Sequence, residues 1–290
     1  MTERSFHAPV LPEQAVSFLV QDPDGTYVDG TLGGGGHTDL IRAKLSGNGR
    51  VIAFDVDEEA IRHATLRLGG TSSRVTFVRA NFNNMQAELK LLGITGVNGI
   101  LLDLGVSSFQ LDNSDLGFSF RADGHIDMRM DRRQTTTGWD IVNTYREEDL
   151  RTILWKFGEE RHGRRIARRI VASRPIDSTV RLRDVVGSAV GGRYLTKTLA
   201  RVFQAIRIEV NRELESLERI LQTSLSFLKP EGRIVVISYH SLEDRIVKTF
   251  FRSHAADLEI LTKKPITVSD QEIEVNPRSR SAKMRVAEHL

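Results

Sequence analysis

The stretch Asp29-Gly30-Thr31-Leu32-Gly33-Gly34-Gly35-Gly36-His37 decides the fold of this chain. It follows the apolar pair Tyr27-Val28, and helical spacing resumes at Thr38. Glycines let the backbone turn tightly and approach a ligand closely, and a turn that opens a helix offers free amides to an anion. The stretch therefore predicts a strand, a nucleotide-binding turn and a helix, in that order.

Asp55 supports a nucleotide ligand. It ends a second apolar run and stands 20 residues after Gly35, near the spacing of about 20 residues at which an acid accepts hydrogen bonds from a ribose. The dinucleotide pattern G-x-G-x-x-G fails, because its third glycine would fall on Thr38 or Asp39. A loop without a pyrophosphate to hold suits adenosine with an amino-acid tail, so we expect S-adenosylmethionine as the cofactor. The alternative is a surface glycine loop.

Runs of strand length alternate with segments of helical spacing along the chain. Strands are predicted at 26–29, 50–55, 75–79, 97–103, 233–238, 258–261 and 282–287. Helices are predicted at 38–45, 58–68, 85–92 and 242–253, with Asp57 as the N-cap of the second. This order predicts an α/β fold, a Rossmann-like doubly wound sheet whose last two strands can pair antiparallel at its edge.

The interval between the fourth and fifth predicted strands, residues 104–232, is too long for one crossover helix. We therefore expect a discontinuous methyltransferase-type sheet domain at 1–112 and 201–290. An inserted, mainly helical domain would occupy 113–200, and a long helix at 201–228 would return the chain to the sheet.

Composition sets limits on the class of protein. The chain has 290 residues, of which 40% are hydrophobic and 27% charged, as in a soluble globular protein. No apolar run approaches the ~18 residues of a membrane span, and the N-terminus lacks a signal-peptide core. We expect a cytoplasmic protein with no membrane contact. Cysteine is absent, which excludes disulfides, thiolate zinc sites and cysteine nucleophiles, and we expect no metal.

Positive charge is concentrated in one segment. From Arg151 to Arg212 the chain has fifteen Lys or Arg and five Asp or Glu, a balance of +10 (15 minus 5) against +3 overall. A solvated helix face is the simpler explanation of such a cluster, but the excess of cations favours contact with phosphates. Within the segment, helical spacing relates Arg161, Arg164, Arg165, Arg168 and Arg169.

Nine segments distributed in order along the chain resemble one family, the bacterial small-subunit ribosomal RNA cytosine-N4 methyltransferases of the MraW type. The matching segments are His7-Ala8-Pro9-Val10-Leu11, the loop Asp29 to His37, Asp103-Leu104-Gly105-Val106-Ser107-Ser108, Gly117-Phe118-Ser119-Phe120, Asp127-Met128-Arg129-Met130, Gly158-Glu159-Glu160-Arg161, Phe203-Gln204-Ala205-Ile206-Arg207, Ile237 to Arg245 and Asn276 to Lys283. The chain departs from the family pattern at His125-Ile126 and at Thr198-Leu199-Ala200.

The resemblance implies a class I S-adenosylmethionine-dependent methyltransferase. Its reaction would move a methyl group to the exocyclic N4 amine of a decoding-centre cytosine in 16S ribosomal RNA. The partners would be 16S rRNA or the small ribosomal subunit, and a homodimer is possible. The implied cofactor-binding residues are Gly35, Gly36, His37, Asp55, Phe82, Asp103 and Gln110.

An exocyclic amine is a poor nucleophile because its lone pair is delocalised into the ring, so the enzyme must position it and accept one of its hydrogens. Many amino-methyltransferases do this with a D/N-P-P-Y/F segment after the fourth strand. That position here reads Asp103-Leu104-Gly105-Val106, which keeps the acid and lacks the prolines and the aromatic residue. Asp103 is the expected catalytic residue. His240, after the fifth strand, is a second candidate as a proton acceptor, with a structural role as the alternative.

RNA contacts are expected from two residue types. Phe118 and Phe120 are the nearest candidates for stacking on the target base. The cationic candidates are Arg129, Arg164, Arg165, Arg168, Arg169, Arg278 and Arg280. Two other functions stay open: a ribosome assembly factor without catalysis, and a DNA amino-methyltransferase.

Overall fold

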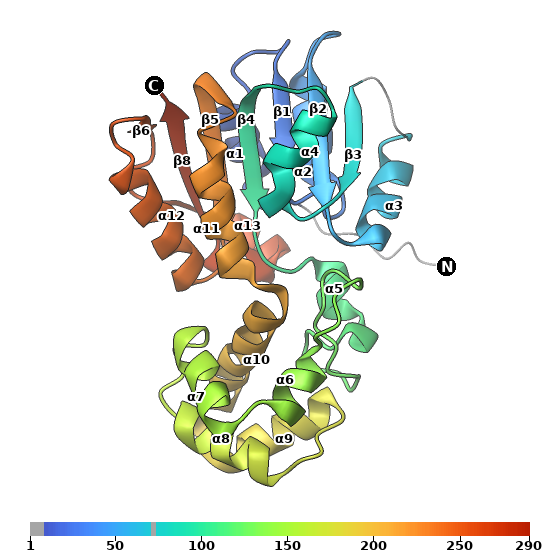
Figure 1. The fold of residues 1–290 in the computed structure, drawn as a ribbon, viewed down its shortest axis with the longest axis vertical. Helices are drawn as coiled ribbons and strands as arrows, with labels where there is room; N and C mark the ends of the chain where they lie inside the picture. The colour runs from blue at the N-terminus through green and yellow to red at the C-terminus, as the bar shows by residue number, and fades with distance from the viewer. Residues whose placement is uncertain (1–8, 71–73) are drawn as a thin grey trace. The chain divides into compact units, whose positions relative to one another are not determined.

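A computed structural model describes residues 9–70 and 74–290. His7 and Ala8 of the first family segment lie outside the described residues. The chain forms two compact units: one comprises Met1–Gly105 and Leu214–Leu290, the other Val106–Glu213. We call them the sheet unit and the helical unit (Figure 1). The segment expected as an insert, 113–200, falls within the helical unit, which extends beyond it at both ends.

The sheet unit is a doubly wound α/β sheet with the strand order β3-β2-β1-β4-β5-β8-β6 (Figure 1). Strands β1 to β5 are parallel to one another, and β8 pairs antiparallel with β5 and β6. This confirms the predicted antiparallel edge and gives the arrangement of class I methyltransferases. The strands are β1 (Thr26–Asp29), β2 (Arg50–Asp55), β3 (Val75–Arg79), β4 (Val97–Asp103), β5 (Leu228–Ser238), β6 (Leu258–Ile260), β7 (Ile266–Thr267) and β8 (Lys283–His289).

Helices of the sheet unit lie between its strands in sequence. They are α1 (Pro12–Leu19), α2 (Gly36–Lys44), α3 (Glu58–Arg67), α4 (Met85–Leu91), α11 (Glu213–Ser224), α12 (Ser241–Ser253) and α13 (Asp270–Val275), with a short 3-10 turn η1 (Phe82–Asn84). Asp57 caps α3 as predicted, because its side chain accepts the amide hydrogen of Glu59. Helix α1 was not predicted; its sequence signal is Pro12 at the first helical position.

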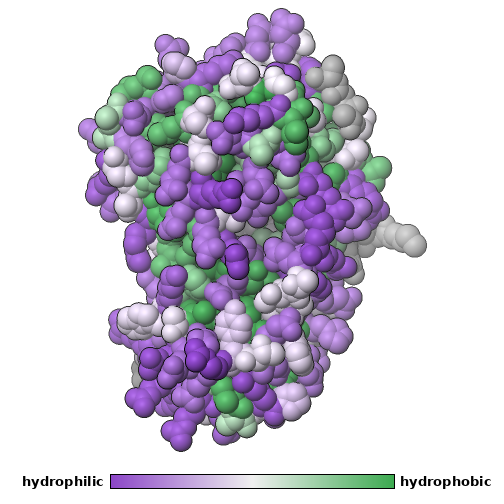
Figure 2. All heavy atoms as spheres, in the orientation of Figure 1, coloured by the Kyte–Doolittle hydropathy of each residue, from purple (hydrophilic) through white to green (hydrophobic). Residues whose placement is uncertain are grey.

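Hydrophilic residues cover most of the face of the molecule that Figure 2 shows. Within the described residues, no helix has both the length and the apolar character needed to cross a bilayer. A few large apolar side chains are nevertheless exposed, among them Trp155 of the helical unit, whose exposed fraction is 66%.

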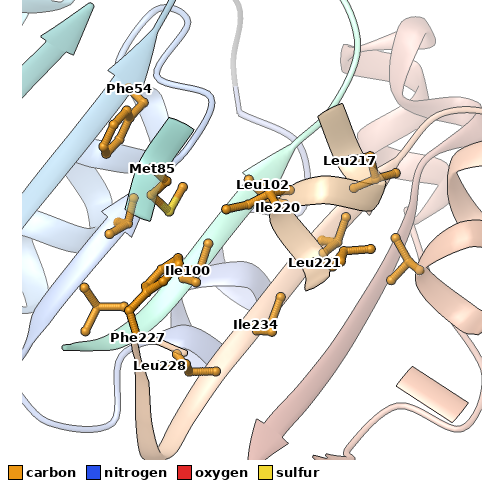
Figure 3. Close-up of a cluster of buried hydrophobic side chains, with 14 of the residues drawn as sticks. Phe54, Met85, Ile100, Leu102, Leu217, Ile220, Leu221, Phe227, Leu228 and Ile234 are labelled. Carbon is orange, nitrogen blue, oxygen red and sulfur yellow. The ribbon is translucent and has the colours of Figure 1, made fainter. Parts of the chain in front are cut away.

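Apolar side chains alternate between the two faces of the sheet, which is the packing that a doubly wound sheet requires. Ile52 and Leu102 face a cluster shared with α4, α11 and α12, whereas Val51 and Leu101 face one shared with α1 and α2. Figure 3 shows the first cluster, in which β4 and β5 lie beneath helix α11. Its labelled members are Phe54, Met85, Ile100, Leu102, Leu217, Ile220, Leu221, Phe227, Leu228 and Ile234.

The helical unit contains α5 (Ser108–Asp112), α6 (Gly138–Thr144), α7 (Glu147–Lys156), α8 (Gly163–Ala172), α9 (Thr179–Val190) and α10 (Leu195–Asn211). Helices α8 and α10 each contact α6, α7 and α9. Three of the five residues that depart from the family pattern are core residues, since Ile126, Thr198 and Leu199 are buried, whereas His125 and Ala200 are exposed.

The predicted continuous helix over 201–228 is wrong. Helix α10 ends at Asn211, and Arg212 adopts a left-handed backbone with φ 49° before α11 begins at Glu213. The Arg207 guanidinium donates to both carboxylate oxygens of Glu213 at 2.8 Å, which stabilises the break. Apolar spacing continues on both sides of Arg212, so periodicity alone does not reveal the break.

Gly30 illustrates how closely the glycine loop packs on the sheet. A Cβ atom there would lie 2.5 Å from Leu102 Cδ2 and 3.2 Å from Met85 Cε, and both side chains are buried. We expect Gly30→Ala to lower the free energy of unfolding by about 1–3 kcal/mol through overpacking. Urea unfolding measures this change. The control is Gly47→Ala, because a Cβ at Gly47 would meet nothing within 4 Å; equal midpoints for the two variants would contradict the packing.

Candidate active site

The glycine loop connects β1 to α2 at the carboxyl edge of the sheet. Gly33 (φ 49°) and Gly35 (φ 77°) have left-handed backbones, and Gly35 caps α2 while its amide donates to the Leu32 carbonyl at 2.8 Å. Among the described residues, a Cβ at Gly33 would have only the Thr31 carbonyl oxygen within 4 Å, at 3.9 Å, whereas a Cβ at Gly36 would lie 2.9 Å from Pro9 Cδ. The loop is thus tightly packed at Gly36 and open at Gly33, as a ligand-facing turn requires.

Two strand-end carboxylates hold this loop in place. Asp29, at the end of β1, accepts the Thr31 amide at 3.1 Å and the Thr38 hydroxyl at 2.7 Å. Asp55, at the end of β2, accepts the Gly33 amide at 2.8 Å and the Asp57 amide at 2.9 Å. Asp29 therefore joins β1 to the glycine loop and to α2. Asp55 joins β2 both to the glycine loop and to the turn that follows β2.

Burial perturbs these carboxylates. Desolvation raises the pKa of Asp55 to about 6, against the lowering effect of the Asp57 and Gly33 amides. Desolvation also raises the pKa of Asp29, although the nearby His37 lowers it. A carboxylate oxygen can accept more than one hydrogen bond, so Asp55 keeps capacity for hydroxyl donors from a ligand.

Asp103 ends β4 and lies between two side chains from neighbouring elements. The Tyr239 hydroxyl donates to Asp103 Oδ1 at 2.8 Å, and His37 Nδ1 lies 3.5 Å from Oδ2. The Asp103 amide donates to the Thr31 hydroxyl oxygen at 2.7 Å. Desolvation raises the pKa of Asp103 to about 6, while His37 and the Tyr239 hydroxyl lower it.

Sequence reasoning missed Tyr239. Asp103 and Ile237 are partners in the parallel pairing of β4 with β5, so Tyr239 follows β5 at the point where β4 has ended. Its ring lies over the next turn, because a Cβ at Gly105 would be 3.4 Å from Tyr239 Cδ2. The fourth-strand segment lacks an aromatic residue of its own, and β5 supplies one beside it. The register of β4 against β5, had it been predicted, would have placed Tyr239 beside Asp103.

His240 has a capping position. It is the N-cap of α12, where Nδ1 accepts the Glu243 amide at 3.3 Å and Nε2 lies 3.2 Å from Glu243 Oε1. This geometry favours the structural role, and a catalytic role for His240 stays a prediction.

The remaining expected cofactor residues lie in different units. Phe82 follows β3 at the start of η1 and packs, partly buried, against the sheet's apolar cluster. His37 is buried, and its Nε2 lies 3.0 Å from the Val10 carbonyl oxygen. Gln110 belongs to the helical unit, where it forms a capping box with Ser107.

The aromatic candidates for base stacking are engaged within the helical unit. Phe118 is 6% exposed. Phe120 makes an edge-to-face contact with Phe203, at a centroid distance of 5.4 Å and an interplanar angle of 70°. Phe118 therefore has no face open to a base in this conformation, which argues against stacking there.

Arg129 is likewise committed to structure. Its guanidinium donates to both oxygens of Asp127, at 2.7 and 3.0 Å, and to the Gln134 carbonyl at 2.7 Å. Asn211 of α10 holds the same loop by accepting the Met130 amide and donating to the Met128 carbonyl, both at 2.8 Å. These contacts favour a structural role for Arg129 within its own loop over a role in binding RNA.

The arginines of α8 differ from Arg129. Arg164, Arg165 and Arg168 are exposed, and none forms an ion pair with any residue that the structure describes. Arg169 is exposed too, although its Nε donates to the Ser188 hydroxyl at 2.9 Å. The opposite face of α8 is buried through Ile166, Ala167 and Ile170. Helix α8 is thus a strongly amphipathic helix that presents arginine to solvent.

In the sheet unit, Arg278 and Arg280 are exposed on the short turn Pro277–Ser281. Arg285, farther along on β8, is buried and donates to Asp244 Oδ1 at 2.6 Å. Arg285 is therefore a structural residue.

Comparison with known proteins gives a consistent result. The model of a family described as "MraW methylase family" matches residues 4–290. A ribosomal RNA small subunit methyltransferase H from Caldicellulosiruptor saccharolyticus is 46% identical over 305 residues, covering 98% of this chain and 99% of the relative. Its counterpart from Clostridioides difficile is 44% identical over 310 residues, with coverage of 98% and 99%. A solved structure of a putative rRNA-methylase from Clostridium thermocellum aligns with a TM-score of 0.48 and 14% identity, over 96% of this chain and 95% of that one.

The Tyr239 hydroxyl stabilises the charged form of Asp103, so its removal has a measurable consequence. We expect Tyr239→Phe to raise the pKa of Asp103 above about 6, because the carboxylate loses a donor while its burial persists. Titration of the Asp103 carboxyl carbon by NMR measures this. The matched control is Tyr145→Phe, which removes a hydroxyl that donates to Glu209 in the helical unit. The same pKa in Tyr239→Phe and the unmodified chain would show that the contact is not formed in solution.

Proposed function

The chain belongs to the MraW methylase family, and on that premise we propose that it methylates the exocyclic N4 amine of a cytosine in the decoding region of small-subunit ribosomal RNA. The enzyme is an S-adenosylmethionine-dependent ribosomal RNA methyltransferase, and the identity of the base, its atom and its region are the proposal. The observation that supports it most directly is the Asp103 carboxylate, half-buried at the end of β4 and in contact with Tyr239 and His37.

The sheet unit fits the cofactor. Among the described residues, the glycine loop is open at Gly33, and Asp55 is a half-buried carboxylate of raised pKa that accepts from two backbone amides and can accept further hydrogen bonds. We assign the ribose hydroxyls to Asp55, the amino-acid tail to the loop at Gly35 and Gly36, and the adenine face to Phe82. His37 completes the proposed set within the sheet unit, whereas cofactor binding by Gln110, a residue of the helical unit, stays a prediction. When bound, S-adenosylmethionine supplies an electrophilic methyl group on a sulfonium.

Asp103 is the reason for proposing an amine as the methyl acceptor. Its ionised carboxylate would accept an N–H of the cytosine amine, orient the nitrogen lone pair and stabilise the positive charge that develops on nitrogen. The Tyr239 hydroxyl keeps that carboxylate charged and fixes its rotamer. A raised pKa makes Asp103 a better proton acceptor near neutral pH than an ordinary aspartate.

We assign RNA binding to the helical unit. The segment from Arg151 to Arg212 has a balance of +10, and the exposed arginines of α8 form its most regular array. Such an array contacts phosphates without reading sequence, so it would position RNA rather than select the base. A cytoplasmic location follows from a ribosomal substrate and is part of the proposal, whereas a homodimer stays a prediction.

Cofactor binding should depend on Asp55 and on pH. Asp55 accepts hydroxyl hydrogens more strongly when ionised, so affinity should be constant above about pH 7 and fall as the pH drops through about 6. Asp55→Asn should weaken binding about 10- to 150-fold, about 1.5–3 kcal/mol, and flatten this pH dependence. Calorimetric titration measures both. Asp39→Asn, at an exposed acid on α2 that pairs with Arg42, is the control. A folded Asp55→Asn variant with the affinity and pH profile of the unmodified chain would remove Asp55 from the site.

The reaction itself is tested on small ribosomal subunits that lack the modification. Incubation with labelled cofactor, digestion to nucleosides and mass spectrometry should reveal 4-methylcytidine. Asp103→Asn should lower turnover roughly 100-fold or more, whereas Asp257→Asn, at an exposed acid of the same unit, should not. Label on another nucleoside would overturn the choice of base and atom. A preference for DNA, read as the deoxy form of the product, would favour the DNA amino-methyltransferase instead.

A further inference from the structure

Trp155 is an aromatic side chain that the fold leaves in water. It lies in the last turn of α7 and is 66% exposed, although its neighbours Ile153 and Leu154 are buried. The other tryptophan, Trp139, is 39% exposed, and its indole N–H donates to Asp177 at 3.0 Å. Leaving a large aromatic side chain exposed forgoes the stabilisation that its burial would give, and such residues are enriched where another molecule covers them.

The surroundings of Trp155 are basic. The first residue of α8, Gly163, packs on α7 so closely that a Cβ there would lie 3.3 Å from Leu154 Cβ and 3.9 Å from the Trp155 backbone nitrogen. The first turn of α8, in which Arg164 and Arg165 are exposed, therefore lies beside the last turn of α7, and Arg168 follows one turn later. Arg151 lies one turn before Trp155 in α7 and is exposed too. We call Arg151, Trp155, Arg164, Arg165 and Arg168 the Trp155 surface.

The charges of this surface decide between possible occupants. Among the residues that the structure describes, none forms an ion pair with the four arginines of the Trp155 surface. A polyanion with flat apolar groups complements both features at once, because phosphates pair with guanidinium groups and bases stack on an indole. Single-stranded RNA has this chemistry, whereas a second copy of the chain would bring the same positive charge to the contact.

We propose that the Trp155 surface binds single-stranded RNA by stacking one base on the Trp155 indole while the neighbouring arginines hold its phosphates. The inference rests on the proposed RNA substrate and adds a binding residue outside the candidate active site. It also provides the aromatic platform that Phe118, buried in the core of the helical unit, does not offer. We expect the stacked base to be one that flanks the target cytosine. Stacking on an indole uses the face of a base, which every base has, and does not read the edges that distinguish one base from another.

Binding is measured with two probes of equal length and phosphate count, a single-stranded RNA and an oligonucleotide without bases. Trp155→Ala should weaken RNA binding roughly 10-fold and leave binding of the abasic probe unchanged, and Trp155→Phe should retain most of the RNA affinity. Reversal of Arg164, Arg165 and Arg168 to glutamate should weaken binding of both probes and flatten their salt dependence. Melting temperatures should be unchanged in Trp155→Ala, because the side chain is exposed.

Fluorescence gives a second readout. The chain has two tryptophans, so Trp139→Phe leaves Trp155 as the only indole. RNA should quench its emission, and the abasic probe should not. Equal RNA affinity of Trp155→Ala and the unmodified chain would overturn the inference, as would a change in oligomeric state on sedimentation without loss of RNA binding. Neither result would affect 4-methylcytidine formation on small subunits, so failure of this inference is distinguishable from failure of the proposed function.

Discussion

The rest of the sheet unit depends on the desolvation of three carboxylates at the ends of β1, β2 and β4. Asp29 is fully buried, Asp55 and Asp103 are half-buried, and a desolvated ion requires donors. The glycine loop and the start of α2 supply donors to Asp29 and Asp55, whereas Asp103 accepts from the Tyr239 hydroxyl. These contacts hold the loop against the strand ends and determine how much hydrogen-bonding capacity the carboxylates keep for a ligand.

Much of the sheet unit could be predicted because its signals are local. Each buried parallel strand is a short apolar run that ends at a polar residue, and β1 to β4 begin and end where the sequence indicates. The glycine loop and the acid of β2 have a spacing that only a strand-turn-helix unit explains. The break at Arg212 escaped prediction because it depends on one residue in a left-handed conformation, held by a pair between Arg207 and Glu213.

The candidate site was only partly predictable, since side-chain partners depend on tertiary packing. The residue types at Phe118 and Arg129 suit RNA contact, but the first is buried and the second is paired with Asp127. Tyr239 shows the opposite case, a residue whose contact with Asp103 exists only because two strands distant in sequence end together. For Trp155, exposure could not be inferred from the sequence, because an aromatic residue at helical spacing is ordinarily part of a core.

The antiparallel strand β8 has a consequence for the order in which the fold can form. It lies between β5 and β6 but follows both in sequence, so during synthesis β6 has no neighbour and the outer edge of β5 stays unpaired until residues 283–289 emerge. An open strand edge is a template for wrong pairing. Arg285 limits the error, because a shift of one residue would turn its side chain to the other face and leave Asp244 without its partner. The ion pair between Arg285 and Asp244 thus favours a single register for the last strand to join the sheet.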